Sequence, residues 1–569
     1  MKLRTSFFNP TAFKKDVTRF APVWVLYSIG LFMILAVCVI DRVDAYRAES
    51  LATSLVFMVF INLGYGFLNG QLLFGDLFNA RHCNALHAMP LQRDCWFYTH
   101  TVAGLAFSLI PNLVMSLIAM PMLGTGWEVA LWWLAGNALQ YLFFFGLAVC
   151  SALCVGSRFA MLLVYGIVNF FSLIVYWFYY AIYEPLLYGV KLSQEPFLRF
   201  CPVWTMAENY ELIEVRQAEL TFDVLAVNPG EGWGYLGICA GIGVLLIGVA
   251  RVLYNRRKLE CAGDFMAVRA LEPVFLVLYT LSAAAFFQIF AELFGGNENV
   301  FLALGLAVGF FTGRMLLMRT IRVFQPKGFL WFIILAVVFV SSMVLTWLDP
   351  LGVVSRIPDT DDVVEVYLSQ YNSVSKPSTP ALDSVEDIDA IRQLHQQVLD
   401  DRFSWEEEYG GNFVYVNLYY VLEDGSTLNR QYTVPADTPA GQLAKKFLSR
   451  PEYVLGTDDL DSILDRARYM YFSYTSYDAS TNTELDPRSD YARGLAEAVY
   501  ADCLAGTMIQ DWAYHQDEES VGWLEFQLER GDGYWDYRSV TIWKSCTNTI
   551  AYMEEFGMPE DAAASDWSK

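Results

Sequence analysis

The sequence predicts an α-helical polytopic membrane bundle of about nine transmembrane helices, followed by a C-terminal α+β soluble domain. Three observations predict this fold class. Long apolar runs fill the first 350 residues, and charged residues make up only 17% of the chain, against roughly 25% in ordinary soluble proteins. The net negative charge of the chain lies after the last apolar run. The expected boundary separates a transmembrane domain, 1–349, from an acidic domain, 350–569.

Nine apolar runs are long enough to cross a bilayer. A transmembrane helix needs about 20 mostly apolar residues, because every backbone polar group must be satisfied inside the helix. No Asp, Glu, Lys or Arg lies between Asp94 and Glu128, or between Arg158 and Glu184. The first run is too long for a cleaved signal peptide, and eight more follow it. The predicted spans are 22–40, 51–73, 99–123, 129–156, 159–183, 233–253, 273–294, 299–318 and 329–348.

The distribution of Lys and Arg predicts the orientation of these spans. Cytoplasmic loops of membrane proteins are enriched in both residues. With the N-terminus in the cytoplasm, 17 of the 22 basic residues of 1–350 fall in inside segments. The five on the outside are Arg42, Arg47, Lys191, Arg199 and Arg216. Nine crossings then put the C-terminal domain outside the cell, and a miscount by one helix would reverse that placement.

The N-terminal segment predicts a short helix before the first span. Asn9 and Pro10 form a helix-start pattern, with Asn as the cap and Pro at the first helical position. Apolar and basic residues then fall on different faces: Phe13, Val17 and Phe20 on one, and Lys14, Lys15 and Arg19 on the others. We expect an interfacial helix along the inner leaflet. An ordinary basic flank of the first span is the alternative.

The C-terminal part changes to strand periodicity. Apolar residues alternate over 414–422, Asp424 and Gly425 supply a turn, and alternation resumes over 428–434, which predicts a β-hairpin. A second strand pair, helices and an aromatic segment in the core or at an edge are also expected. The second strand pair is expected at 523–528 and 538–543, around Gly531-Asp532-Gly533. The helices are expected at 386–400, 438–449 and 489–504, and the aromatic segment is 470–479.

Cysteine usage and charge limit what the chain can bind. The ten cysteines have no metal-ligand spacing, so no metal site is expected. Cys503 and Cys546 are the only cysteines after residue 350, and they could form a disulfide outside the cell or remain two buried thiols. Residues 351–569 hold 16 Lys and Arg against 40 Asp and Glu, a net charge of −24. This charge disfavours nucleic acid and anionic lipid as ligands of that part.

Three absences bear on function. The chain has no G-x-x-x-x-G-K-[ST], so it is not expected to hydrolyse ATP by itself. No acid or base lies deep in a predicted span, whereas ion-coupled carriers need such a group. The histidines, at 82, 87, 100, 395 and 515, form no catalytic or zinc motif. We therefore expect no catalytic residue and no cofactor in this chain, and transport powered from another chain.

The cytoplasmic loop 74–97 is the most informative segment. Its sequence predicts a basic, partly apolar helix over 77–88 that stops before Pro90, with Arg93 leading into the next span. Four side chains could project into the cytosol as a docking knob: Leu77, Phe78, Arg81 and Leu86. A loop that lies along the membrane is the alternative.

A run in this loop and the next helix matches a known pattern. It consists of Leu77-Phe78-Asn79, Arg81, Leu86-His87-Ala88-Met89-Pro90-Leu91 and Arg93, followed by Gly104-Leu105 and Pro111-Asn112. This run resembles ABC-2 type transporter permeases, with Met89 where that family usually has Leu. The opening 5–20, the run 256–265 and the hairpin residues 419–432 resemble a Gram-positive subgroup with an extra C-terminal domain of unknown function.

The resemblance implies a permease subunit in a bacterial, Gram-positive plasma membrane. A separate ABC ATPase would bind ATP and Mg, and a second, identical or related permease would complete the transporter. The implied substrate is amphipathic, a peptide or lipid-like, and moves outward. The residues implied to engage the ATPase are Leu77, Phe78, Asn79, Arg81, Leu86, His87, Pro90 and Arg93, with Phe13, Lys14 and Lys15 of the N-terminal helix.

Some patterns have simpler interpretations. Gly305, Gly309 and Gly313 form a small-residue stripe, and Gly237 and Gly241 form another; packing within the chain is expected, with a dimer seam as the alternative. The acidic loop 184–231 is expected to be a solvated helix-turn element, with cation binding as the alternative.

Two other function classes compete with the permease. One is a membrane-anchored sensor or scaffold that displays an extracytoplasmic ligand-binding domain, and the other is a membrane enzyme acting on lipids or cell-wall precursors. Nine spans exceed what an anchor needs, and catalytic groups are lacking.

Overall fold

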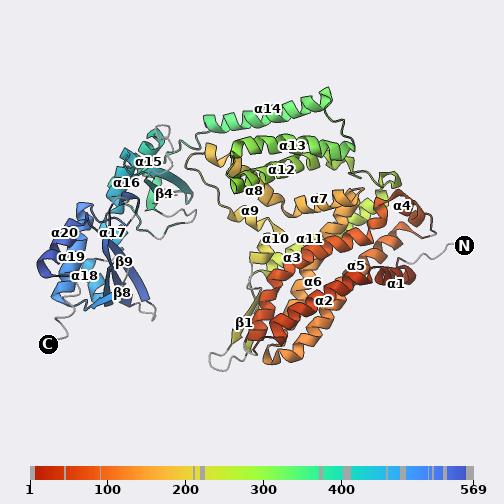
Figure 1. Cartoon of the computed structure of the whole chain (residues 1–569), viewed down its shortest axis with the longest axis horizontal. Helices are drawn as coiled ribbons and strands as arrows, with labels where there is room; N and C mark the ends of the chain where they lie inside the picture. The colour runs from red at the N-terminus through yellow and green to blue at the C-terminus, as the bar shows by residue number, and fades with distance from the viewer. Residues whose placement is uncertain are drawn as a thin grey trace. The chain divides into compact units, whose positions relative to one another are not determined.

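The fold of the chain comes from a computed structural model, in which two compact units are distinguished (Figure 1). Unit 1 is Met1–Tyr183 with Gln194–Ser342, and unit 2 is Glu184–Ser193 with Met343–Lys569. Unit 2 therefore includes a segment from the loop after the fifth predicted span. The structure describes residues 7–43, 46–89, 91–208, 212–217, 224–370, 376–377, 379–401, 412–456, 459–474, 482–510, 512–515, 518–529 and 535–558.

Unit 1 consists almost entirely of helices. Its elements are α1 (Pro10–Arg19), α2 (Ala21–Leu35) with the π-helical η1 (Ala36–Ile40), α3 (Arg47–Leu73), η3 (Gly75–Phe78), α4 (Ala80–His87), α5 (Arg93–Ala119), η4 (Met120–Met122), η5 (Gly124–Gly126), α6 (Glu128–Cys154), α7 (Arg158–Asn169), α8 (Phe171–Ile182), α9 (Glu195–Arg199), α10 (Pro202–Glu208), β1 (Ile213–Gln217), β2 (Val224–Pro229), α11 (Trp233–Arg256), η7 (Leu259–Cys261), η8 (Arg269–Leu271), α12 (Glu272–Phe294), α13 (Glu298–Met318) and α14 (Pro326–Leu348), the last of which crosses the boundary between the units.

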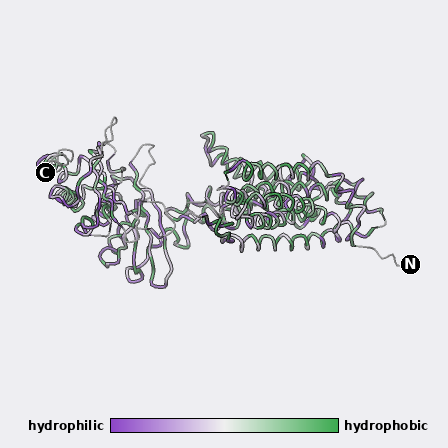
Figure 2. Tube along the Cα trace, turned by 90° about the horizontal axis from the view of Figure 1, so that it is seen from below, coloured by the Kyte–Doolittle hydropathy of each residue, from purple (hydrophilic) through white to green (hydrophobic). Residues whose placement is uncertain are grey.

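The described residues contain eight helices that are long and apolar enough to cross a membrane. They correspond to eight of the nine predicted spans, and Figure 2 shows their hydrophobic character along the trace. The exception is the predicted span 159–183. Here α7 and α8 are bent by 68° at a short break, so this segment is a broken helix pair rather than one continuous helix.

Helix α6 forms the centre of the unit 1 core. Large apolar side chains on several of its faces, such as Tyr141, Phe144 and Phe145, are fully buried. Its backbone approaches that of α11 closely, because a Cβ added at Gly243 would lie 2.5 Å from the carbonyl oxygen of Leu142. Glycine at this crossing permits a helix contact that no larger residue would allow.

The β1–β2 hairpin marks one end of unit 1, called here the hairpin end. The backbone N–H of Val224 donates to Thr125 Oγ1 at 3.2 Å, and Gly126 lies against Val224 and Ala48. The hairpin thus covers the first turns of α3 and α6.

The opposite end of unit 1, called here the α4 end, holds the start of α7. Val155 forms a β-bridge with Met266, and the N–H of Gly263 donates to the carbonyl of Gly156 at 2.8 Å. The chain leaves α6 at the α4 end and reaches β1 at the hairpin end. It therefore travels the length of unit 1 between Ser157 and Ile213.

Unit 2 contains the same arrangement of elements twice. A strand, a helix, a hairpin and a second helix follow one another, and in both copies the first strand pairs antiparallel with the first strand of the hairpin. The first copy is β3 (Val363–Ser369), α15 (Val385–Asp401), β4 (Phe413–Leu422), β5 (Thr427–Pro435) and α16 (Pro439–Leu448). The second is β6 (Ala467–Tyr474), α19 (Asp490–Ala505), β8 (Ser520–Glu529), β9 (Trp535–Trp543) and α20 (Thr547–Phe556), with β7 (Asn482–Leu485) added at the edge beside β6 and the short helices α17 (Pro451–Val454) and α18 (Leu460–Arg466) between the copies.

Each copy has its own apolar core beneath its sheet. Val416, Leu418 and Leu394 belong to the first core, and Phe472, Phe526 and Leu495 to the second. The predicted hairpins are confirmed as β4–β5 and β8–β9, and the three predicted helices as α15, α16 and α19. The aromatic segment contributes the interior strand β6; its later residues and the turn Gly531-Asp532-Gly533 lie outside the described residues.

The segment Glu184–Ser193 packs on the first copy in unit 2. The N–H of Gln431 donates to the carbonyl of Gly189 at 2.9 Å, and the ring of Tyr188 lies 5.2 Å from that of Tyr432. Part of the predicted solvated loop is therefore packed against β5. Among the described residues, no group of three or more acidic, His or Cys side chains could hold a metal ion. The described part of the loop therefore gives no support to the alternative of cation binding.

Candidate functional site

The predicted coupling residues gather at the α4 end of unit 1. Helix α4 begins where Asn79, in an extended conformation, accepts hydrogen bonds from the backbone N–H groups of Arg81 (2.9 Å) and His82 (3.5 Å). Asn is a favoured cap for this geometry, since it satisfies N–H groups that have no partner within the helix. The expected helix over 77–88 is therefore shorter, and the residues before Asn79 form η3.

The apolar members of the predicted docking knob point inward. Leu77 is 3% exposed, Phe78 9% and Leu86 8%, so these side chains contribute to the core and not to an outer surface. The physical reason is that η3 turns the chain at the end of α3, which brings both apolar residues of Leu77-Phe78 beneath α4. The prediction that Leu77, Phe78 and Leu86 project into the cytosol is wrong.

The remaining members of the predicted set divide by exposure. Arg81, Lys14 and Lys15 are exposed, and Phe13 is half-buried. His87 is half-buried with Nδ1 2.8 Å from the carbonyl of Cys83. Pro90 lies outside the described residues. Arg81, Lys14 and Lys15 are therefore the members of the predicted set with exposed basic side chains.

Arg257 joins three elements at the α4 end. Its Nη1 donates to the carbonyls of Ala152 and Leu153, both at 3.1 Å, and its Nη2 donates to the carbonyl of Leu77 at 3.3 Å. Burial lowers the pKa of the Arg257 guanidinium from its ordinary value. The guanidinium therefore fastens η3 to the last turn of α6, whose carbonyls have no partner within the helix.

A second arginine connects α5 with the end of α11. Nη1 of Arg93 donates to the carbonyls of Asn255 and Arg257, both at 3.1 Å. On the next residue, the carboxylate of Asp94 accepts from Arg251 Nε and from Asn255 Nδ2, both at 3.0 Å. Arg93 was among the predicted coupling residues; its role in the structure is to hold two helix ends together.

Helix α1 is attached to α5 through a buried polar pair. His100 Nδ1 lies 2.8 Å from Asp16 Oδ2, and both side chains are almost completely buried. The N–H of Asn9 donates to Thr99 Oγ1 at 3.1 Å, while Asn9 caps α1 as predicted. At the other end of α1, Arg19 pairs with Asp76 of η3 at 3.5 Å. These contacts combine α1, η3, α4 and the ends of α5, α6 and α11 into one layer, which we call the basic junction.

A cluster of uncharged polar side chains lies deeper in unit 1, between α2, α3, α5 and α6. Asn62 Nδ2 donates to Asn137 Oδ1 at 3.2 Å and to Gln140 Oε1 at 3.1 Å, and Tyr27 donates to Asn62 Oδ1 at 3.2 Å. Asn112 Nδ2 donates to Tyr27 Oη at 2.9 Å. These hydrogen bonds between uncharged groups tie the four helices together.

The structure also places the glycines and cysteines that were selected from the sequence. Gly305, Gly309 and Gly313 of α13 lie against α12 in the same chain, which Figure 1 shows beside it, whereas Gly237 and Gly241 of α11 have no neighbouring atom within 4 Å of an added Cβ. Cys503 and Cys546 are free buried thiols, so the disulfide that they could form is absent here. The Sγ of Cys546 lies 3.7 Å from Met508 Sδ instead.

Comparison with known proteins gives no further guide to this site. No family model, no curated protein and no solved structure matches the chain.

Sequence reasoning did not identify Arg257, Asp94 and Asp76 as the groups that join the helix ends. The signal for Arg257 was its place in the basic run Arg256-Arg257-Lys258, where a side chain directly after a long apolar helix can turn back to its neighbours' terminal carbonyls. The sequence around Asp76 and Asp94 gives no comparable signal that identifies their partners.

Proposed function

We propose that this chain is the membrane-spanning permease subunit of an ABC transporter of the ABC-2 type, driven by a separate ATPase. In this proposal it exports an amphipathic, peptide or lipid-like substrate. Support comes from the eight apolar helices, from the residues that resemble this family, and from the absence of a nucleotide-binding motif in the sequence.

The bent pair α7–α8 counts as a ninth crossing in this proposal. The chain enters α7 at the α4 end and has reached the hairpin end by β1, as a crossing between these two points requires. Four helices, α11 to α14, then separate Glu184–Ser193 from the end of α14. An even number of crossings returns the chain to the same side, which agrees with both segments belonging to unit 2.

The Lys and Arg bias gives the orientation. The basic junction carries Lys14, Lys15, Arg81 and the run 256–258, and such residues favour the cytoplasmic side. The α4 end is then cytoplasmic, the hairpin end is extracytoplasmic, and unit 2 lies outside the cell. A cysteine introduced at Asp424, in the exposed β4–β5 turn, should react with a membrane-impermeant maleimide on intact cells. Reaction only after lysis would reverse the orientation.

The observation that carries the coupling part of the proposal is the network of arginine contacts beside α4. Arg257 links η3, which directly precedes α4, to the end of α6, and Arg93 links α5 to the end of α11. A partner that displaces η3 and α4 would therefore also pull on these helix ends. ATP-driven movement of a bound ATPase would in this way change the arrangement of the spans.

The test is co-purification from membranes of the native host. The tagged chain should retain an ATPase subunit and vanadate-sensitive ATP hydrolysis. Placing negative charge on the exposed face of α4, with Arg81→Glu and His82→Glu, should reduce the retained ATPase about tenfold, equivalent to about 1.4 kcal/mol. Arg322→Glu, a matched change on another basic loop, should leave it unaltered. Phe78 is unsuitable for this test because its side chain is buried.

Two outcomes would count against the proposal. Undiminished ATPase in the Arg81 and His82 variant would refute the role of α4. A wild-type chain that transports solute without any ATPase would refute the permease assignment itself.

A further inference from the structure

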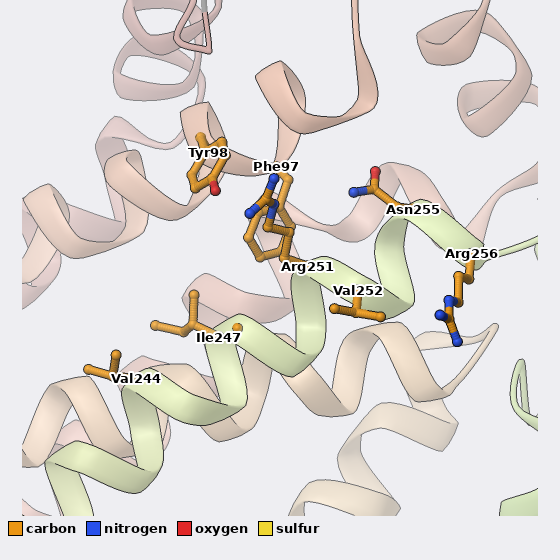
Figure 3. Close-up of a pocket in the computed structure, with 9 residues that line it drawn as sticks. Phe97, Tyr98, Val244, Ile247, Arg251, Val252, Asn255 and Arg256 are labelled. Atoms are coloured by element: carbon orange, nitrogen blue, oxygen red, sulfur yellow. The ribbon is translucent and has the colours of Figure 1, made fainter.

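A groove lies between α5 and α11 near the α4 end of unit 1. Its volume is about 520 Å³, within the range of roughly 300–1,000 Å³ that small-molecule sites occupy. Figure 3 shows Val244, Ile247 and Arg251 on successive turns of α11, with Phe97 and Tyr98 of α5 beside Arg251. The groove is therefore apolar along most of its length and cationic at one end.

Glycine shapes the floor of this groove. A Cβ added at Gly248, which lines the groove, would meet no atom within 4 Å, and the same is true at Gly241 two turns earlier. The two residues are separated by about 10 Å along the helix at 1.5 Å per residue. At these two glycines no described part of the chain covers α11, and their separation is suited to an extended hydrocarbon chain.

The cationic end of the groove has N–H donors beyond those used in hydrogen bonds within the chain. Arg251 pairs with Asp94 through Nε and Nη2, and its guanidinium lies 5.2 Å from the centre of the Tyr98 ring. Arg256 also lines the groove, and its side chain has no hydrogen bond or ion pair among the described residues. Arginines are suited to a phosphate, which accepts paired hydrogen bonds from guanidinium.

The local charge favours an anionic ligand. The helix ends that form this region, residues 93–98 and 251–258, contain five basic residues (Arg93, Arg251, Arg256, Arg257 and Lys258) and one acidic residue, Asp94. A free inorganic anion would leave the apolar walls at Val244 and Ile247 in contact with water. A ligand with both an acyl chain and a phosphate satisfies both parts of the groove, and basic pockets between transmembrane helices commonly hold anionic headgroups.

We infer that this groove binds one anionic phospholipid of the inner leaflet, with an acyl chain along Gly241 and Gly248 and its phosphate at Arg251 and Arg256. The inference rests on the proposed function for its membrane placement, with the α4 end at the cytoplasmic face. The site itself needs no ATPase, so it can be tested on the permease chain alone.

The test uses the purified full chain, reconstituted with phosphatidylglycerol or phosphatidylcholine, extracted into mild detergent and analysed by native mass spectrometry. The wild-type chain should retain one phosphatidylglycerol and no phosphatidylcholine. Gly248→Leu fills the groove and should reduce retention about tenfold. Arg251→Gln should also reduce it, whereas Asp94→Asn should increase it, because Asp94 competes with the phosphate for the same guanidinium.

The matched control is Gly30→Leu on α2, another glycine with no atom within 4 Å of an added Cβ. It should retain phosphatidylglycerol as the wild type does, and each variant should elute as a single species with an unchanged melting temperature. If Arg251→Gln changes the melting temperature, lipid retention by Gly248→Leu and Asp94→Asn decides the test instead.

Several outcomes would overturn the inference: equal retention of phosphatidylcholine, undiminished retention in Gly248→Leu, a decrease in Asp94→Asn, or displacement of the lipid by millimolar inorganic phosphate, which would indicate a headgroup-only site. Failure of ATPase co-purification would leave a positive lipid result standing, and failure here would leave the coupling role of α4 standing. The two proposals therefore fail separately.

Discussion

His100 of α5 and Asp16 of α1 lie 2.8 Å apart, from Nδ1 to Oδ2, in a nearly dry environment. Removing one member of such a pair leaves the other polar group buried without its partner, at a cost of about 1–3 kcal/mol. We therefore predict that Asp16→Ala loosens α1 from α5. A cysteine introduced at the buried Ala12 should react with maleimide about tenfold faster in that background.

Asp16→Asn is the matched control for this change. An Asn oxygen can still accept a hydrogen bond from the imidazole N–H, so labelling of Cys at position 12 should stay close to the wild-type rate. Rapid labelling in the Asn variant as well would mean that charge, and not the hydrogen bond, holds α1 in place.

Arg257 is predicted to control the accessibility of α4. Arg257→Met keeps much of the side-chain volume but removes the three donated hydrogen bonds to Leu77, Ala152 and Leu153. The native thiol of Cys83, which lies on the buried face of α4 and is 1% exposed, should then become reactive, as measured by mass spectrometry of alkylated peptides. Arg256→Met, which removes an adjacent arginine without these bonds, should leave Cys83 protected.

The spans could be predicted because hydropathy over about 20 residues is a strong signal that needs no tertiary information. The bend between α7 and α8 could not, since no proline marks it and Gly166 lies a turn before it within α7. It follows Asn169, a buried residue whose Nδ2 donates to the carbonyl of Tyr165 within α7. A hydropathy average over about 20 residues does not reveal a single polar residue such as Asn169.

The candidate site was predicted in location but not in detail. The pattern of Leu77 and Phe78 beside Arg81 was compatible with either an exposed or a buried apolar pair, because a turn of unknown geometry precedes them. In the structure, packing against the core buries Leu77 and Phe78. Likewise, the segment Glu184–Ser193 could not be assigned to unit 2 from its sequence, since its contact with Tyr432 joins residues more than 200 positions apart.

The α6–α11 crossing offers a sharp stability test on two neighbouring glycines. Gly243→Ala would drive a Cβ to 2.5 Å from the carbonyl oxygen of Leu142, whereas Gly241→Ala meets no atom within 4 Å. We expect Gly243→Ala to destabilise unit 1 by about 1–3 kcal/mol, the usual cost of overpacking. Gly241→Ala should be neutral or slightly stabilising, because alanine favours the helix. Thermal unfolding in detergent distinguishes them, and equal melting temperatures would contradict the close crossing.

The carboxylate of Asp502 is predicted to stabilise the second copy in unit 2. It is fully buried and accepts hydrogen bonds from the N–H groups of Asn548 and Thr549 at the start of α20, and from the Thr507 and Thr549 hydroxyls. Asp502→Ala should cost about 2–4 kcal/mol, because several buried donors lose their acceptor. Hydrogen exchange of α20 amides should accelerate accordingly, while β4 amides in the first copy should exchange as in the wild type.

His395 should make the first copy sensitive to acid. Its ring nitrogens lie 3.1 Å from Tyr420 Oη and 2.8 Å from Tyr432 Oη, and a neutral imidazole can donate from one and accept at the other. Burial, with a smaller contribution from the positive charge of Arg430, lowers the pKa of His395 from 6.5 to about 3. The folded state therefore keeps the ring neutral well below the pH at which the unfolded chain protonates it.

The sign of the effect follows from proton binding. Between pH 6.5 and about 3 the unfolded chain binds one more proton at this position than the folded chain. Stability from the neutral ring is complete above pH 6.5 and falls by about 1.4 kcal/mol per pH unit as the pH decreases through that window. Hydrogen exchange of β4 amides, corrected for intrinsic rates, should show wild type losing about 2–3 kcal/mol more than His395→Gln between pH 6.5 and 4.5. Parallel curves would mean that the buried ring accepts a proton without unfolding.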